Sequence, residues 1–196
     1  IGQRYKYVDR MASRNVLCGG HPDNPRAWFV VGGGSYEGEP TDTISGLDHL
    51  EGATVSILAD GSVHPRRVVT DGAVTLDQPA SRVIVGLPYT ARIETLPLDP
   101  PEPVGTTQGK RMRIPAVTVR VEHTRGLRVG PIGDVLRESR ERRTEAWGAP
   151  ITPITGDQRV VLTGGYTPNA ALALQQDDPL PMTVLGVIPE SWVGDT

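Results

Sequence analysis

Three stretches of this sequence resemble sites for reaction or ligand binding, and the first is a glycine-rich run. Gly105–Lys110, Gly-Thr-Thr-Gln-Gly-Lys, is similar to the loop that holds phosphates in nucleotide-binding proteins. That loop has four residues between its glycines and a Ser or Thr directly after its lysine. Here three residues separate the glycines, Arg111 follows the lysine, and a proline run precedes the first glycine. We therefore interpret Gly105–Lys110 as a basic turn.

Histidines and a neighbouring glutamate form the second group. His49 and Glu51 have side chains suited to acid–base catalysis. Because no nucleophile or metal motif accompanies them, we expect a polar corner in which His49 hydrogen-bonds to the backbone. Cys18 is the only cysteine, which excludes an intrachain disulfide and a cysteine-based metal site. The four histidines lack a second ligand at zinc spacing: His21, His49, His64 and His123.

Adjacent carboxylates form the third group. Asp177 and Asp178 have the chemistry to bind a cation, but Ca²⁺ takes six or more oxygen ligands, so we interpret them as a solvated loop. The Gly-x-Ser-x-Gly motif of serine hydrolases is absent from the sequence. We therefore predict no catalytic residue, no metal ligand and no cofactor, and we expect that the protein is not an enzyme.

Arginine and aromatic residues indicate recognition instead of catalysis. The chain has 20 basic residues, of which only Lys6 and Lys110 are lysines. The planar guanidinium suits interfaces, where Trp and Tyr are also enriched. Codon usage in a GC-rich genome would explain the same excess of arginine. The residues that we expect at an interface are Trp147, Tyr166, Trp192, Arg140 and Arg143.

Charge and composition do not favour binding to nucleic acid. The net charge is −3, and aromatic residues make up 5% of the chain. The basic runs at 110–113 and 140–143 contain no aromatic residue on which bases would stack.

The elements that must position these residues are short β-strands. The 23 glycines and 18 prolines favour tight turns over long helices. We predict an all-β fold of short antiparallel strands in sandwich or barrel-like modules, with little helix. The clearest module is 46–98, where Asp60-Gly61 and Asp71-Gly72 predict type I′ hairpin turns. Its expected strands are 53–59, 62–69, 73–76, 82–87 and 90–96, with Pro79 breaking the chain between the third and the fourth.

The remaining segments are predicted around this module. Residues 1–45 are interpreted as the end of a preceding domain or an arm, with one strand at 27–31 that Gly32–Gly34 ends. Residues 99–115 are a proline-rich linker or loop. Residues 116–196 form a β-rich region that packs with the first module. It includes strands at 116–123, 159–163 and 171–175, a marginal helix or exposed loop at 134–145, and a central strand at 182–188.

The sequence shows no segment that would target or insert it into a membrane. No apolar run approaches the roughly 18 residues that a membrane helix needs. The polar start at 1–10 lacks a signal-peptide pattern. The single cysteine, Cys18, fits synthesis in a reducing cytoplasm.

A series of short runs resembles tail proteins of short-tailed bacteriophages. Each run is weak by itself, and the series is specific, spanning about residues 27–190. The runs are Ile44–Gly52, Leu58–His64, Val85–Tyr89, Glu94–Pro97, Gly109-Lys110, Arg143–Gly148 and Gln176–Glu190.

This resemblance implies structural work in a virion tail. The nearest comparison is the tail tubular or nozzle family, which implies a homo-oligomeric ring, contacts with other tail proteins and transient passage of DNA without tight binding. It implies a location in the phage tail after synthesis in the host cytoplasm, and it transfers no catalytic residues. The alternative function is a module that binds a host-surface receptor or glycan. A depolymerase is a third option, and it would need two facing carboxylates in a cleft.

Overall fold

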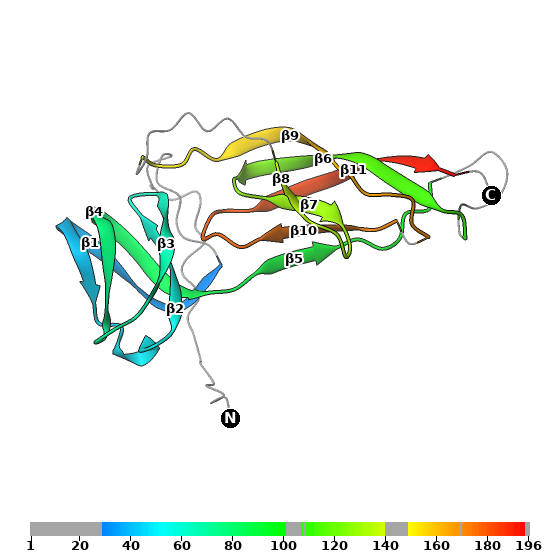
Figure 1. Ribbon diagram of the computed structural model, residues 1–196. Helices are drawn as coiled ribbons and strands as arrows, with labels where there is room; N and C mark the ends of the chain where they lie inside the picture. The colour runs from blue at the N-terminus through cyan, green and yellow to red at the C-terminus, as the bar shows by residue number, and fades with distance from the viewer. Residues whose placement is uncertain (1–28, 101–106, 108, 140–148, 169, 195–196) are drawn as a thin grey trace, which may run out of the picture. The chain divides into compact units, whose positions relative to one another are not determined.

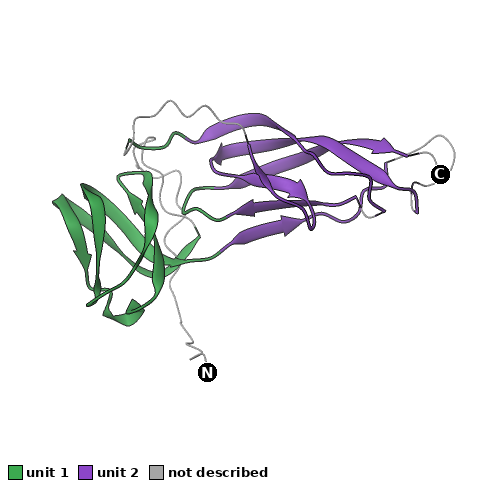
Figure 2. Cartoon of the chain, viewed as in Figure 1, with its two compact units in different colours: residues 1–89, 144–152, 177–181 green, residues 90–143, 153–176, 182–196 purple. Residues whose placement is uncertain are grey.

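The computed structural model describes residues 29–100, 107, 109–139, 149–168 and 170–194, which fold almost entirely as β-strands (Figure 1). Every strand pair is antiparallel, so the predicted all-β fold class is confirmed. The chain divides into two compact units (Figure 2). Unit 1 comprises residues 1–89, 144–152 and 177–181, and unit 2 comprises residues 90–143, 153–176 and 182–196.

Unit 1 contains one four-stranded sheet in the order β1-β4-β2-β3. Its strands are β1 (Val30–Ser45), β2 (Thr54–Ala59), β3 (Ser62–Val68) and β4 (Ala73–Pro88), with a short 3₁₀ helix η1 (Asp48–Leu50). The pairing of β1 with β4 shifts register three times, which lets the two long strands bend around one core. That core is lined by Ile44, Leu47, Leu50, Val55, Ile57, Val69, Val74, Leu76, Ala80, Val83 and Val85.

Both Asp-Gly pairs form the tight turns that the sequence predicts. Asp60 and Gly61 have φ of 45° and 78°, and Asp71 and Gly72 have φ of 53° and 64°. Positive φ at both central residues is the signature of a type I′ turn, whose twist matches that of the flanking strands. Asp60 thereby joins β2 to β3.

The glycines at 32–34 do not end the first strand, so that prediction is wrong. β1 begins at Val30 and runs through them to Ser45, with a register shift between Val31 and Gly34. A Cβ at Gly33 would lie only 1.7 Å from the carbonyl oxygen of Val85 on β4. Glycine at 33 therefore permits close approach of two backbones, and residues 30–45 belong to unit 1 instead of a preceding domain. The first two residues of the strand predicted at 27–31 lie outside the described residues.

Pro79 does not break the chain between two strands, and this prediction is also wrong. β4 continues from Ala73 to Pro88. Its partners on β1 jump from Thr43, opposite Thr75, to Thr41, opposite Ala80. Pro79 lies in the interval between these pairs, where its missing N–H costs no ladder hydrogen bond.

Unit 1 is completed by chain segments that are distant in sequence. Leu180 and Leu58 form a small buried cluster, against which Ile151 packs. The backbone N–H of Ile151 donates to the carbonyl oxygen of Gly61 at 3.1 Å. Arg66 donates from Nη2 to the carbonyl oxygen of Asp177 at 2.9 Å. The module predicted at 46–98 is therefore built from three separate stretches of the chain.

Unit 2 contains two sheets, which form the two layers of a sandwich (Figure 1). The first has the order β5-β10-β7-β8 and the second the order β11-β6-β9. Buried side chains of both sheets share one core, which includes Val117, Val119, Val129, Leu172 and Leu174. The strands are β5 (Ala91–Glu94), β6 (Met112–Thr124), β7 (Arg128–Pro131), β8 (Arg137–Glu138), β9 (Ile154–Val161), β10 (Leu172–Gln176) and β11 (Thr183–Val193).

The boundaries in unit 2 differ from the predicted ones in three places. β5 pairs with β10 in unit 2 and does not join the 46–98 module. β6 begins at Met112, inside the range predicted as a linker. The two-residue strand β8 occupies part of the range predicted as a marginal helix or loop, of which residues 140–145 lie outside the described part.

β11 is an edge strand, although its apolar sequence predicts a central one. Val184 and Val187 pack against the core, whereas Leu185 and Ile188 on the same strand are 60% and 50% exposed. One face of β11 covers the core, and the other face is open. The hydrophobic pattern of a strand that is apolar on both faces does not distinguish this arrangement from full burial.

Candidate functional site

The outer face of the β11-β6-β9 sheet is the side turned away from the sandwich core. In antiparallel pairs, residues opposite each other lie on the same face. β6 buries Val117, Val119 and Val121 in the core, so the alternate residues face outward. Register then assigns side chains of the flanking strands to the same outer face: Asp157, Arg159 and Val161 from β9, and Ile188, Glu190 and Trp192 from β11.

Two forked ion pairs cross this outer face. Arg120 on β6 donates from Nε and Nη2 to Asp157 on β9 at 2.7 and 2.9 Å. Arg159 on β9 donates from Nε and Nη2 to Glu190 on β11 at 2.8 and 2.9 Å. The second pair spans the central strand and so links the two edges of the sheet. Paired two-point contacts fix the direction of each guanidinium plane.

These contacts change the acidity of the two carboxyl groups. Hydrogen bonds from Arg120 hold the pKa of Asp157 below its usual value, and hydrogen bonds from Arg159 do the same for the pKa of Glu190. The pKa of each arginine is raised in turn by its carboxylate. All four side chains are about half exposed, so the pairs order the surface and add little to folding stability.

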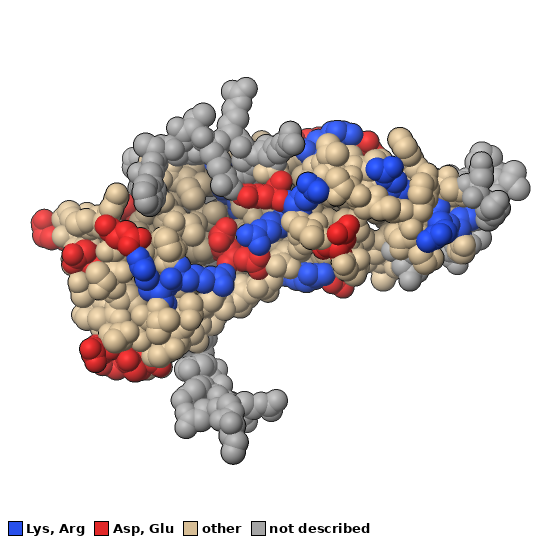
Figure 3. Space-filling model, viewed as in Figure 1, with Lys and Arg blue, Asp and Glu red and all other residues tan. Residues whose placement is uncertain are grey.

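Exposed apolar side chains lie beside the ion pairs. Val161 is 59% exposed and stands opposite Ala116, and Ile188 is 50% exposed and stands opposite Thr118. Leu185 occupies the register shift between Val184 and Gly186. Basic and acidic side chains are interspersed over the visible surface of unit 2 (Figure 3). Apolar contacts surrounded by paired charges are the usual composition of a protein interface.

One end of the outer face combines cationic and aromatic groups, which we call the cationic aromatic end: Arg111, Arg113, Tyr166 and Trp192. The guanidinium carbon of Arg113 lies 5.9 Å from the ring centroid of Trp192, in the range of a cation–π contact. Trp192 is 58% exposed and Tyr166 is 44% exposed. The Tyr166 ring lies 3.3 Å from the position of a Cβ on Gly194, whose N–H donates to the Arg111 carbonyl oxygen at 2.8 Å.

Arg111 and Arg113 differ from the other arginines that the structure describes. Each of the others has a hydrogen-bond or ionic partner, as in the pairs on the outer face. Within the described residues, the guanidinium of Arg111 has no such partner, and that of Arg113 contacts only Trp192. The Nε of Arg113 is buried and makes no hydrogen bond.

The structure thus brings together two of the five residues predicted at an interface, Tyr166 and Trp192. Trp147, Arg140 and Arg143 lie outside the described residues. In the sequence, no aromatic residue lies within the basic run at 110–113, so the sequence alone does not predict a binding site there. The fold supplies aromatics from segments far along the chain, because Met112 bridges Thr167 on one side and pairs with Val193 on the other.

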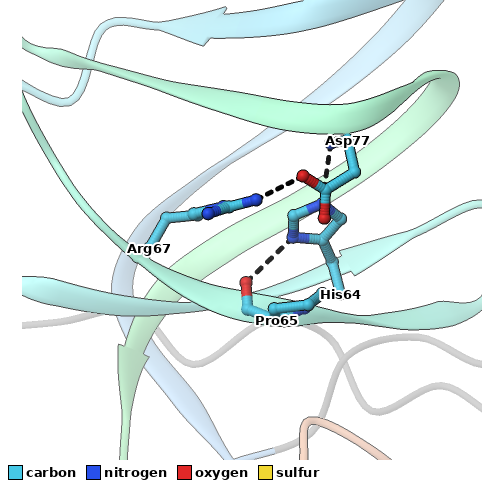
Figure 4. A network of polar contacts seen from close by, with 4 residues as sticks. All are labelled: His64, Pro65, Arg67 and Asp77. Carbon is cyan, nitrogen blue, oxygen red and sulfur yellow. Dashed lines mark hydrogen bonds and ion pairs between the residues drawn. The ribbon is translucent and has the colours of Figure 1, made fainter.

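The most elaborate polar contact in unit 1 involves a histidine and an aspartate (Figure 4). The Nε2 of His64 accepts the backbone N–H of Asp77 at 2.9 Å and lies 3.2 Å from the Asp77 carboxylate. Its Nδ1 lies 2.9 Å from the carbonyl oxygen of Pro65. Arg67 forms an ion pair with the same carboxylate. Since both ring nitrogens of His64 are engaged, neither is available to activate a nucleophile, and the network fastens β3 to β4.

Two hollows are lined in part by residues of this network. One has a volume of about 160 Å³ and is lined by Asp60, Ser62, His64 and Gln78, among others. Asp60 holds its position by accepting the backbone N–H groups of Ser81 and Arg82. The other has a volume of about 390 Å³ and is lined by residues from Arg67 to Asp77. Neither hollow brings two free carboxylates into opposition, as glycoside hydrolysis would need.

Other residues singled out from the sequence are placed as follows. His49 Nε2 lies 2.7 Å from the carbonyl oxygen of Gly32, which confirms the predicted polar corner. Glu51 accepts the backbone N–H groups of Asp71 and Gly72. Over the described ranges, no group of three or more His, Cys, Asp or Glu side chains is placed to hold a metal ion. None of the helical segments in those ranges has the length and apolarity to cross a bilayer.

Comparison with known proteins adds no assignment. No protein-family model matches the chain, and no curated protein is recognisably similar to it.

Proposed function

We propose that this chain is a structural module of a short-tailed bacteriophage tail, which works by assembling with copies of itself and with other tail proteins. The observation that carries the proposal is the outer face of the β11-β6-β9 sheet. There Val161 and Ile188 stand exposed on either side of the Arg159–Glu190 ion pair. Because the face is built on strands, its side chains are held in place before any partner arrives.

The physical argument is that this face has the makeup of a contact surface. Burying Val161 and Ile188 against a partner would remove apolar area from water at roughly 25 cal/mol per Å². The ion pairs are already satisfied within the chain, so covering them leaves no charge without a counter-charge. A face that buries apolar groups without stranding charges favours association.

The tail assignment depends on the sequence resemblance in the runs between residues 44 and 190. The mixed charge of the surface fits a conduit through which DNA passes. Phosphates bind where unpaired basic groups accumulate, and the net charge of this chain is −3. A chain of this charge would hold passing DNA weakly.

Labelling of virions tests this function directly. Antibodies raised against the purified chain, bound to gold and applied to short-tailed virions whose genome encodes it, should mark the tail in electron micrographs. Label on the capsid would contradict the proposal. Unlabelled virions would also contradict it if the same antibodies detect abundant protein in the infected cells. A matched control uses the same antibodies after absorption with the purified chain.

The weak interaction with DNA has its own test. Purified protein should not retain a double-stranded DNA fragment in an electrophoretic shift at physiological salt, because the net charge is −3 and the outer-face arginines are paired. Tight retention at that salt concentration would contradict a role in passive DNA passage.

A further inference from the structure

The cationic aromatic end needs an explanation that assembly through the outer face does not give. Trp192 lies four residues beyond Ile188 on β11, about 13 Å along an extended strand. It therefore stands apart from the apolar side chain of Ile188, and the paired carboxylate of Glu190 lies between the two. We propose that Arg111, Arg113, Tyr166 and Trp192 form a binding site for a carboxylated saccharide, of the kind found in acidic polysaccharides.

The arginines specify the carboxylate. A guanidinium presents parallel N–H donors that match the two oxygens of a carboxylate. Within the described residues, Arg111 and Arg113 have no carboxylate of the chain itself to satisfy these donors. The other described arginines already have partners, so a carboxylate ligand would be attracted to this pair over the rest of the surface.

The aromatic rings specify the sugar. A pyranose ring presents a face of C–H groups that packs on the electron-rich face of an aromatic ring, and its hydroxyls remain in water. Trp192 and Tyr166 are exposed by 58% and 44%, which leaves ring surface for such packing. Arg113 lies near the Trp192 ring, so a sugar on the aromatic surface would have its carboxylate within reach of a guanidinium.

The site is held by backbone pairing instead of a free loop. Met112 is buried and lies between Arg111 and Arg113, and its N–H and carbonyl oxygen both bond to Thr167 at 2.8 Å. This bridge fixes Tyr166 beside the start of β6. The Tyr166 ring packs close to Gly194, where a Cβ would lie 3.3 Å from the ring. The order of the site lowers the entropy that a ligand must overcome.

A nucleic acid fits these observations less well. It carries a negative charge at every nucleotide, so it binds along extended stripes of unpaired cations. Beyond the cationic aromatic end, Arg120 and Arg159 on the same face are already paired with Asp157 and Glu190, so no stripe of unpaired cations continues along its described residues. A saccharide with a carboxylate at one position needs only a local cation pair.

The test is a titration of the full chain by isothermal calorimetry. The probes are oligomers of galacturonate, glucuronate, mannuronate and guluronate, each compared with its methyl ester and with a neutral maltooligosaccharide of equal length. We expect at least one uronate oligomer to bind, and we expect its methyl ester to bind about tenfold more weakly or worse, because esterification removes the charge that the arginines recognise.

Variants identify the site. Arg111→Gln and Arg113→Gln should each weaken uronate binding about tenfold, and Trp192→Ala should weaken both uronate and residual ester binding. Trp192→Phe should retain part of the affinity. Arg92→Gln is the matched control, because it removes an exposed arginine that is already paired with Glu94 on the other sheet, and it should bind as the wild type does. Circular dichroism checks that each variant is folded.

Three results would overturn the site: no uronate binding, equal binding of acid and ester, or variants that bind like the wild type. A single-stranded oligonucleotide that binds while every uronate fails would assign the arginines to phosphate instead. These outcomes test the binding site and not the proposed assembly, because sedimentation velocity measures the assembly state of the same variants separately. Arg111→Gln and Arg113→Gln should leave the assembly state unchanged.

Discussion

Two carboxylates at turns of unit 1 accept hydrogen bonds from backbone amides, whereas those on the outer face of unit 2 accept them from arginine side chains. Asp60 accepts from Ser81 and Arg82, and Glu51 accepts from Asp71 and Gly72. Asp157 and Glu190 in unit 2 instead meet guanidinium groups at about half exposure. Asp60 and Glu51 thus hold the turns of the unit 1 sheet, and Asp157 and Glu190 order a surface of unit 2.

This difference has an energetic consequence. A backbone N–H that loses its acceptor has no second conformation in which to find another, so its loss costs stability. When an exposed ion pair is broken, water solvates the remaining charged group, so the stability of the fold changes little. Substitutions in unit 1 should therefore change the free energy of unfolding, and substitutions on the outer face should change association.

The largest effect is expected from Gly33→Ala. The added Cβ would lie 1.7 Å from the Val85 carbonyl oxygen, so β1 and β4 would have to separate. We expect a loss of about 3 kcal/mol or more in unfolding free energy, measured by urea denaturation. Gly34→Ala is the matched control, because its nearest neighbour is a Leu47 methyl at 3.9 Å, and it should change stability far less. Equal effects of the two changes would contradict the close approach.

Asp60→Ala should have the next largest effect. It removes the acceptor of two backbone N–H groups. It also places an alanine, which has no polar side chain to stabilise the left-handed conformation, at φ of 45°. The expected loss is about 2–3 kcal/mol. Asp60→Asn tolerates positive φ and keeps one acceptor oxygen, but it leaves one of the two N–H groups without an acceptor, so it should cost less than Asp60→Ala, about 1–2 kcal/mol. Thermal unfolding of the two variants side by side separates turn geometry from hydrogen bonding.

The outer-face pairs should show the smallest effect on stability. NMR titration should place the pKa of the Asp157 carboxyl below its usual value, and Arg120→Gln should return it toward that value. Because the pKa is lower in the folded protein, the pair stabilises the fold above the pKa of an unfolded aspartate. That contribution is lost as pH falls through the folded pKa, and it is small because both groups are exposed. An unchanged pKa in Arg120→Gln would mean that another group acidifies Asp157.

Local chemistry explains why part of this fold was predictable from the sequence. Asp60-Gly61 and Asp71-Gly72 carry their own turn geometry, and Val117–Val121 alternate with polar residues on a half-buried strand. These signals depend on neighbours in the chain and not on distant partners. The all-β class follows from them.

What the sequence concealed depends on distant partners. The passage of β1 through Gly32–Gly34 requires Val85 to lie opposite, and the bend at Pro79 requires the register shift in β1. The cationic aromatic end joins residues 111–113 to 166 and 192, which no local pattern connects. Of the four residues at this end, Tyr166 and Trp192 are the two that residue type alone predicts at an interface.

Sedimentation velocity of three proteins tests the central claim most directly. The wild type should sediment as an oligomer. Val161→Glu combined with Ile188→Glu should sediment as a folded monomer, because it places unpaired charges on the outer face. Val68→Glu alters a valine of similar exposure, 54%, on β3 of unit 1 and should remain oligomeric. A wild type that stays monomeric at every concentration, or a double variant that assembles as the wild type does, would contradict assembly through this face.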